Sequence, residues 1–208
     1  MRITRRARSA FVALTPGLIA AWALAGLYLS LGPSLTTSLL HLASVVVGAL
    51  VPATLFAAAA VASVATLGWT ARRAVLCGSA LLALGVAITL LGIRDESALP
   101  LFLGSGVAGL GFGAAFAASF RALAPLAEPN ERAALIGAVY VVSQIAASVP
   151  AVIAGLAVTR YGLRDTATVY AIVVIALALA AALATGRTLH APRRAAGITT
   201  GETTESEI

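Results

Sequence analysis

The chain has 208 residues, of which 60% are hydrophobic and only 11% are charged, whereas about a quarter of the residues of a soluble domain are charged. This composition excludes an ordinary soluble domain and indicates a protein of the lipid bilayer. The formal net charge of +6 has no soluble domain to display it as a basic face, so we expect no nucleic-acid partner.

Six apolar segments are long enough to cross a membrane, since each reaches the roughly 20 residues that a helix needs to span about 30 Å of hydrocarbon. The alternation of a membrane β-barrel is lacking. The sequence therefore predicts an all-α membrane protein with six transmembrane helices in a domain of residues 10–186, a basic leader at 1–9 and a polar, disordered tail at 187–208. The expected helices are residues 10–31, 42–67, 74–93, 99–124, 133–159 and 166–185.

The orientation of these segments follows from arginine, which supplies all 14 basic side chains. With the N-terminus in the cytoplasm, only Arg94, Arg160 and Arg164 lie on the outer side, and the other arginines lie inside. This distribution satisfies the positive-inside rule. We therefore expect a multi-pass protein of the plasma membrane with the leader, the tail and both termini in the cytoplasm.

The first three segments differ in character. Trp22 lies near the middle of the first segment, which is unusual because tryptophan prefers the membrane interface, and a cavity or interhelix position explains it. Pro52 loosens the second segment locally, and Gly68, Arg72 and Arg73 form the short loop that follows it. The third segment, like the sixth, is apolar nearly all round, so we expect both to face lipid.

The fourth segment, around GVAGLGFGAAFAASF, is rich in glycine. Gly106, Gly109 and Gly113 are interpreted as helix-packing positions, because small residues at this spacing let two backbones approach inside a membrane, and a smooth helix of this kind also suits a rocking motion. Phe112 and Phe116 begin an aromatic stripe at steps of four residues. That stripe fits either the wall of a cavity for an apolar solute or plain packing against helices and lipid.

The fifth segment gathers small and polar residues on one face, at steps of three and four. The amide of Gln144 needs hydrogen-bond partners that hydrocarbon does not supply. Two interpretations remain open, a substrate cavity and a hydrogen bond across a helix interface. Pro150 loosens this segment as Pro52 loosens the second. The residues of this face are Gly137, Tyr140, Gln144, Ser148, Ala151 and Gly155.

No enzyme chemistry is expected. The two histidines, His41 and His190, lie in a loop and in the tail, so Ser105 has no base within reach and is interpreted as a small packing residue. Paired carboxylates, a Cys/His ligand set and a phosphate-binding glycine loop are all lacking. We therefore expect no catalytic residue, no metal and no cofactor. A membrane-bound enzyme ranks behind the two functions considered below, a transporter and a scaffold.

The order of these features resembles half of a major facilitator superfamily (MFS) transporter. The stretches that carry the resemblance are GWTARR, GLGFGAAF and EPNERAALIGAVYVVSQIAASVPAVIAGL, within residues 10–186. The family's loop motif is matched only by Gly68, Arg72 and Arg73, which is similar to the degenerate loop of C-terminal halves. The resemblance implies a six-helix half bundle with a three-plus-three inverted repeat. It also implies that the first and fourth helices line a central cavity while the second and fifth flank the other half.

From this resemblance we expect an MFS-type permease that moves a small solute by alternating access, most simply efflux of an amphipathic or apolar compound. A second six-helix half is then needed, either a missing N-terminal half, a separate chain or a second copy in a homodimer. The alternative is a six-helix scaffold or assembly subunit without transport activity of its own. The substrate-cavity candidates are Trp22, Phe112, Phe116, Tyr140, Gln144 and Ser148.

Overall fold

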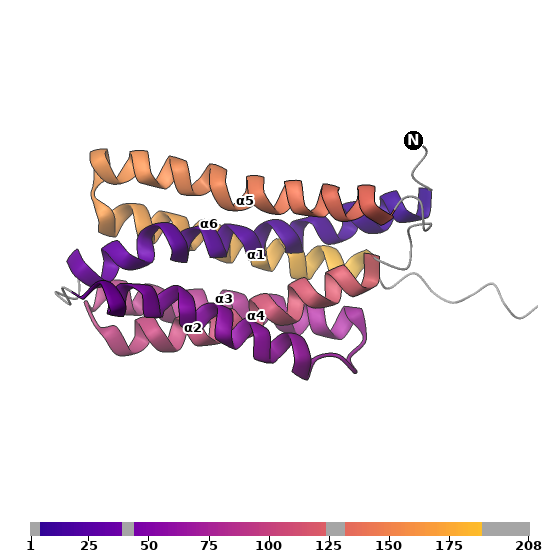
Figure 1. The fold of residues 1–208 in the computed structure, drawn as a ribbon, viewed down its shortest axis with the longest axis horizontal. Helices are drawn as coiled ribbons and strands as arrows, with labels where there is room; N and C mark the ends of the chain where they lie inside the picture. Colours follow the sequence, from indigo (N-terminus) through magenta and orange to yellow (C-terminus); the bar gives the residue numbers. More distant parts are fainter. Residues whose placement is uncertain (1–4, 39–43, 124–131, 189–208) are drawn as a thin grey trace, which may run out of the picture.

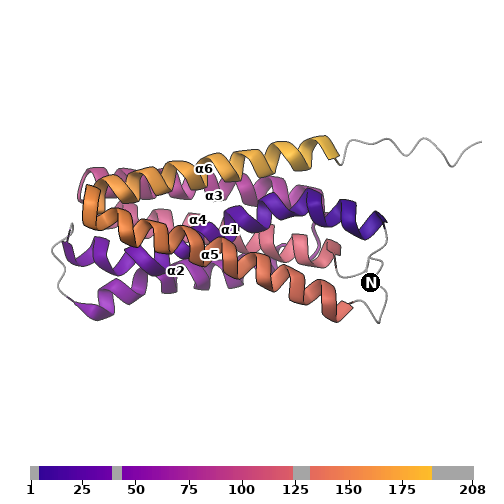
Figure 2. The ribbon, with the colours of Figure 1, turned by 90° about the horizontal axis from the view of Figure 1, so that it is seen from above.

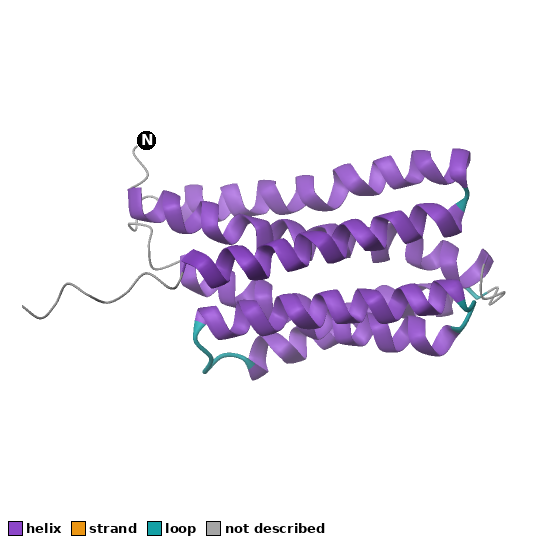
Figure 3. Cartoon of the chain, turned by 180° about the vertical axis from the view of Figure 1, so that it is seen from behind, coloured by secondary structure: helices purple, strands orange, loops and turns teal. Residues whose placement is uncertain are grey.

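The computed structural model describes residues 5–38, 44–123 and 132–188, and these form six helices with no strand among them (Figure 3). Each helix is long and apolar enough to cross a membrane, so the prediction of an all-α membrane protein with six spanning helices is confirmed. The helices are α1 (Arg5–Ser38), α2 (Val45–Ala65), α3 (Ala71–Arg94), α4 (Ala98–Leu123), α5 (Arg132–Tyr161) and α6 (Leu163–Thr188).

The main difference from the expected boundaries is at α1, which continues to Ser38 although Pro33 lies inside it. The last turns of α1 pack against the start of α2, where Gly48 approaches Pro33 and Gly32 faces Val51. Tertiary packing of this kind outweighs the local preference for a break at proline. At the α5–α6 turn, Asp165 lies in the first turn of α6 and is not its N-cap, because the helix already begins at Leu163.

The helices run side by side along the long axis of the molecule, and the start of α1 and the end of α6 lie at the same end of the bundle (Figures 1 and 2). α4 packs against α3 and α2, α1 packs against α5 and α6, and α3 also contacts α6. The two central helices, α1 and α4, touch each other. Consequently α5 depends on α1 and α6 for its contacts, and α2 depends on α4 and α1.

Glycines at intervals of seven residues bring α3 and α4 together. A Cβ atom added to Gly78, Gly85 or Gly92 would lie within 3 Å of α4 backbone, and one added to Gly104 or Gly111 would meet α3 equally closely. Contact of two backbones is the way in which small residues drive helix association in lipid, where the hydrophobic effect contributes little. The heptad spacing keeps all these glycines on the shared side of the two antiparallel helices.

A different side of α4 faces α2. A Cβ atom on Gly109 would clash with the carbonyl oxygen of Leu55, and one on Gly113 with that of Ala59. Gly106 is looser, with the Thr54 methyl group 3.8 Å away. α4 therefore uses two glycine faces for two neighbours, with the Gly109–Gly113 pair at the spacing expected of close helix packing.

Burial along the spans corrects one expectation. Half of the α3 span is buried, whereas only 28% of the α2 span and 17% of the α5 span are buried. The expectation that α3 faces lipid is wrong for the side that carries Gly78, Gly85 and Gly92, because these glycines admit α4. The two most exposed helices of the described chain are α2 and α5, the pair that the resemblance places beside a second half.

Candidate functional site

Five aromatic side chains join α1, α2 and α4, from the middle of the bundle towards the C-terminal end of α4. The Trp22 ring is edge-on to Phe112 and to Phe116, with ring centroids 5.7 Å apart in both pairs. Phe112 stacks on Phe116 at 5.9 Å and receives the edge of Phe56 at 5.9 Å. Edge-to-face pairs of this kind stabilise by about 0.5–1.5 kcal/mol beyond the area that they bury. We call Trp22, Phe56, Phe112, Phe116 and Phe120 the aromatic cluster.

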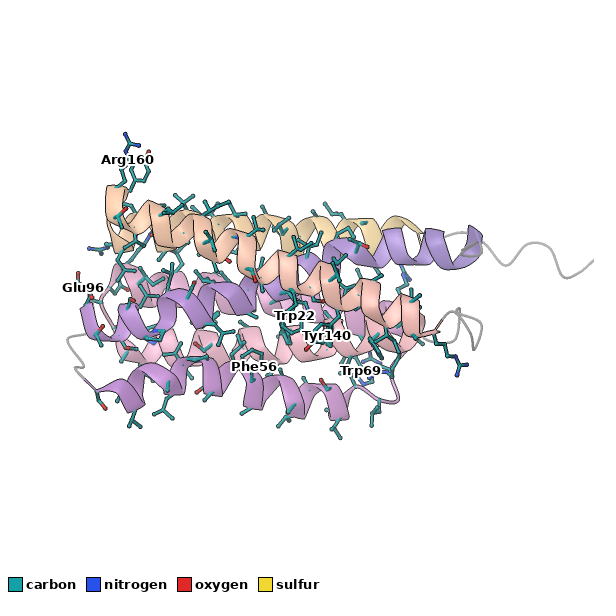
Figure 4. All side chains as sticks on the ribbon, turned by 45° about the horizontal axis from the view of Figure 1, so that its top comes forward. Trp22, Phe56, Trp69, Glu96, Tyr140 and Arg160 are labelled. Atoms are coloured by element: carbon teal, nitrogen blue, oxygen red, sulfur yellow. The ribbon has the colours of Figure 1, made fainter. Side chains whose placement is uncertain are left out.

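Burial within the aromatic cluster falls off towards α2. Phe112 is buried, Trp22 is mostly buried and Phe56 is 37% exposed. The indole Nε1 of Trp22 is buried and has no hydrogen-bond partner among the described residues. Figure 4 shows Trp22 and Phe56 at the same level along the bundle. Trp22 therefore occupies an interhelix position, and the aromatic cluster is apolar apart from one buried, unpaired indole N–H.

The polar face of α5 points away from the bundle. Tyr140 is 66% exposed, Gln144 and Ser148 are exposed, and nothing approaches Gly137 or Gly155. The opposite side of the helix holds α5 in place, because the side chains that it buries are Leu135, Val139, Ser143, Ala146 and Ala154.

The predicted site residues of α5 lie near the depth of the aromatic cluster. Figure 4 shows Tyr140 near Trp22 along the bundle, and Gly26, four residues after Trp22, faces the Ala147 carbonyl, three residues after Gln144. Gln144, two residues before buried Ala146, is turned about 200° from it around the helix. The structure therefore brings Trp22, Phe112 and Phe116 together but leaves Gln144 and Ser148 on a surface that no described residue covers.

The two predicted helix-loosening prolines both lie inside helices, Pro52 in α2 and Pro150 in α5. Pro52 lies beside Gly32 of α1, and Pro150 lines a cavity described below. Each is therefore placed where its helix contacts α1 or α6.

The loop between α2 and α3 carries its own contacts. Arg73 lies over the Trp69 ring at 4.5 Å from its centroid, and the Thr70 side chain caps α3 by accepting a hydrogen bond from the Arg73 backbone. Arg121 of α4 donates to the Thr66 carbonyl at 3.0 Å. Gly68 is exposed with open space around it. The arginines thus tie the ends of α2, α3 and α4 together.

A second feature, which sequence reasoning missed, is a cavity of about 610 Å³ between α5 and α6. Its walls are almost wholly hydrocarbon, and Asp165 and Thr166 lie at the end where the two helices join. The available signal was the small side chains Ala154 and Ala157 of α5, one turn apart, which leave space opposite α6. The lining residues are Ala23, Pro150, Ile153, Ala154, Ala157, Tyr161, Asp165, Thr166, Val169, Tyr170, Val173 and Leu177.

In residues 5–38, 44–123 and 132–188, no group of three His, Cys, Asp or Glu side chains could hold a metal ion. Ser105 is buried and donates to the Leu101 carbonyl one turn before it. The described arginines and carboxylates lie at or near the helix ends, so the middle of the bundle is uncharged.

Comparison with known proteins adds no relative. No model of a protein family matches the sequence, and no curated protein is similar to it.

Proposed function

We propose that this chain is one six-helix lobe of an MFS-type transporter, the lobe that corresponds to the C-terminal half. Together with a second lobe, it carries a small amphipathic or apolar solute across the membrane by alternating access. The exposed polar face of α5 carries this proposal. A glutamine amide has no partner in hydrocarbon, yet Gln144 points away from every described helix. Another protein lobe, or a water-filled cavity between two lobes, supplies the partners that lipid lacks.

The exposed face of α2 supports the same arrangement. Ala49, Ala53, Ala57 and Ala60 lie on it at steps of three and four and are all exposed. Small residues in this pattern permit close approach of a further helix. The two helices with the least burial, α2 and α5, thus present the surfaces that a second lobe needs.

The packing pattern supports a three-plus-three repeat. In such a repeat α1 corresponds to α4, α2 to α5 and α3 to α6. The α1–α5 contact then corresponds to α4–α2, and the α1–α6 contact to α4–α3. The α1–α4 and α3–α6 contacts each correspond to themselves. All of these contacts are present, although the α1–α2 and α5–α6 contacts have no counterparts of similar extent in α4–α5 and α2–α3. Helices at exchangeable positions, α2 and α5, each contain a proline. Transporters built from such repeats bind solute near the membrane midplane, the depth of the aromatic cluster.

The scaffold alternative loses part of its basis. A scaffold that bound other membrane proteins through its glycine faces would find Gly109 and Gly113 occupied by α2, and Gly104 and Gly111 by α3. Gly137 and Gly155 on α5 have open space around them, and both lie on the polar face that we assign to the second lobe.

The test is efflux of ethidium, an amphipathic aromatic probe, from native cells in which the gene is deleted and then restored. Restoring the wild-type chain should lower ethidium accumulation. The Gln144→Leu and Trp22→Leu variants should lower it less than the wild type does, since each substitution removes a polar or aromatic group of the proposed cavity. Leu179→Ala on the exposed side of α6 is the matched control and should behave as wild type. Equal efflux from all three variants at equal membrane abundance would exclude the assigned cavity residues.

A further inference from the structure

The cavity between α5 and α6 has the form of a groove on the side of the bundle, which we call the α5–α6 groove. Ile153, Val169 and Val173 form its rim and are 61%, 61% and 49% exposed. Its floor contains Ala23 and Ala154, both buried. A concave wall of this composition in a spanning helix pair faces acyl chains, so its natural occupant is apolar and elongated.

The length of the groove matches one leaflet of a bilayer. Along α5 it extends from Pro150 to Tyr161, about 16 Å at 1.5 Å per residue, and half of the hydrocarbon core is about 15 Å. One end of it coincides with the α5–α6 turn, at the end of the bundle where Arg160 and Glu96 also lie (Figure 4), and we take this as the outer end. The groove therefore runs from the headgroup level to the bilayer midplane, the depth of one acyl chain.

A polar atom without a partner marks the outer end of the groove. Thr166 is 7% exposed, and its Oγ1 has no hydrogen-bond partner among the described residues. The hydroxyls of Thr54 and Ser105 donate to the carbonyl four residues earlier, and the buried hydroxyls without a partner in the described spans are those of Ser119, Ser143 and Thr166, of which Thr166 lines the groove. Leaving a buried hydroxyl unbonded is costly, so the Thr166 hydroxyl points to a ligand that carries an acceptor oxygen below the headgroup.

The mouth of the groove carries a carboxylate. Asp165 lines it and has no ion-pair partner in the described chain, where Arg164 instead pairs with Glu96 at 3.4 Å. An unpaired carboxylate at this level is complementary to a headgroup ammonium.

We propose that the α5–α6 groove binds one zwitterionic phospholipid with a primary-amine headgroup. One acyl chain lies along the groove, an ester carbonyl accepts a hydrogen bond from Thr166 Oγ1, and the ammonium binds Asp165. Ile153 is nine residues from Gln144, so it lies about half a turn around α5 from the polar face. Lipid binding at the groove is therefore independent of the proposed second lobe.

The test is native mass spectrometry of the purified full-length chain titrated with dioleoyl-phosphatidylethanolamine or dioleoyl-phosphatidylcholine. The ethanolamine lipid should bind more tightly, because a trimethylated ammonium cannot donate a hydrogen bond to Asp165. Ala157→Phe fills the groove and should abolish the tight site. Thr166→Val keeps the side-chain shape without the hydroxyl and should weaken binding about fivefold, the value of one hydrogen bond.

Ala180→Phe is the matched control, because Ala180 is exposed on α6 beyond the inner end of the groove, and this variant should bind as wild type. Thermal unfolding of each variant in the same detergent establishes that it is folded. The proposal would be overturned by equal binding of the two lipids to the wild-type chain. Unchanged binding in a folded Thr166→Val or Ala157→Phe variant would overturn it as well.

Discussion

Trp22 is the residue on which the middle of the bundle depends, because its ring touches both Phe112 and Phe116 and so joins α1 to α4. An aromatic side chain at such a point contributes both buried area and edge-to-face geometry. Its indole N–H is buried without a partner, so the hydrogen-bonding group adds nothing to the stability of the isolated lobe. The ring contacts indicate a packing role for Trp22, whereas the unpaired N–H bears on a binding role, so the two roles can be tested separately.

Two substitutions of Trp22 should therefore lower the free energy of unfolding by different amounts. Trp22→Ala should destabilise the chain by about 3–5 kcal/mol, the usual cost of removing a buried large aromatic side chain. Trp22→Phe keeps an aromatic ring and loses only the unpaired N–H and some volume, so its cost should be well under half of that. The measurement is the free energy of unfolding in detergent, followed by circular dichroism. Equal losses in the two variants would contradict the packing account.

At the scale of the helix, the contact between α3 and α4 is set by glycine register. The sequence predicted Gly109 and Gly113 of α4 as packing positions, and the structure adds a second packing side with Gly104 and Gly111. The sequence also contains the seven-residue spacing of Gly78, Gly85 and Gly92. Hydropathy alone predicted a lipid-facing helix there and missed its contact with α4. Uniform hydropathy does not tell lipid from a neighbouring helix, since both are apolar. Side-chain size was the informative property.

Glycine substitutions test this register directly. A Cβ at Gly85 would clash with the Ala108 backbone nitrogen, so Gly85→Ala should force α3 and α4 apart and lower the unfolding midpoint by several degrees. Gly137→Ala is the matched control, because nothing lies within 4 Å of its Cβ, and helix propensity should leave its stability equal or about 1 kcal/mol higher. Thermal unfolding that ranked the two variants the other way round would exclude the proposed α3–α4 contact.

For the whole molecule, composition was enough to predict six spanning helices and their approximate limits, because hydrocarbon thickness fixes helix length. The position of the α5 polar face was not predictable in the same way. Its periodicity showed that Gln144 and Ser148 share a side, but the direction of that side depends on which face α1 and α6 bury. The α5–α6 groove could not be predicted from hydropathy, because it arises from the small side chains of Ala154 and Ala157 opposite α6, and hydropathy does not measure side-chain volume.

The uncovered polar face of α5 is the central claim, and photocrosslinking in native membranes tests it most directly. Benzoylphenylalanine placed at Gln144 should form covalent adducts with a six-helix polypeptide or with a second copy of this chain, both identified by peptide sequencing, whereas the same probe at Leu179 on exposed α6 should form lipid adducts. If position 144 yields lipid adducts to the same extent as position 179, the polar face of α5 lies in hydrocarbon and the two-lobe account is wrong.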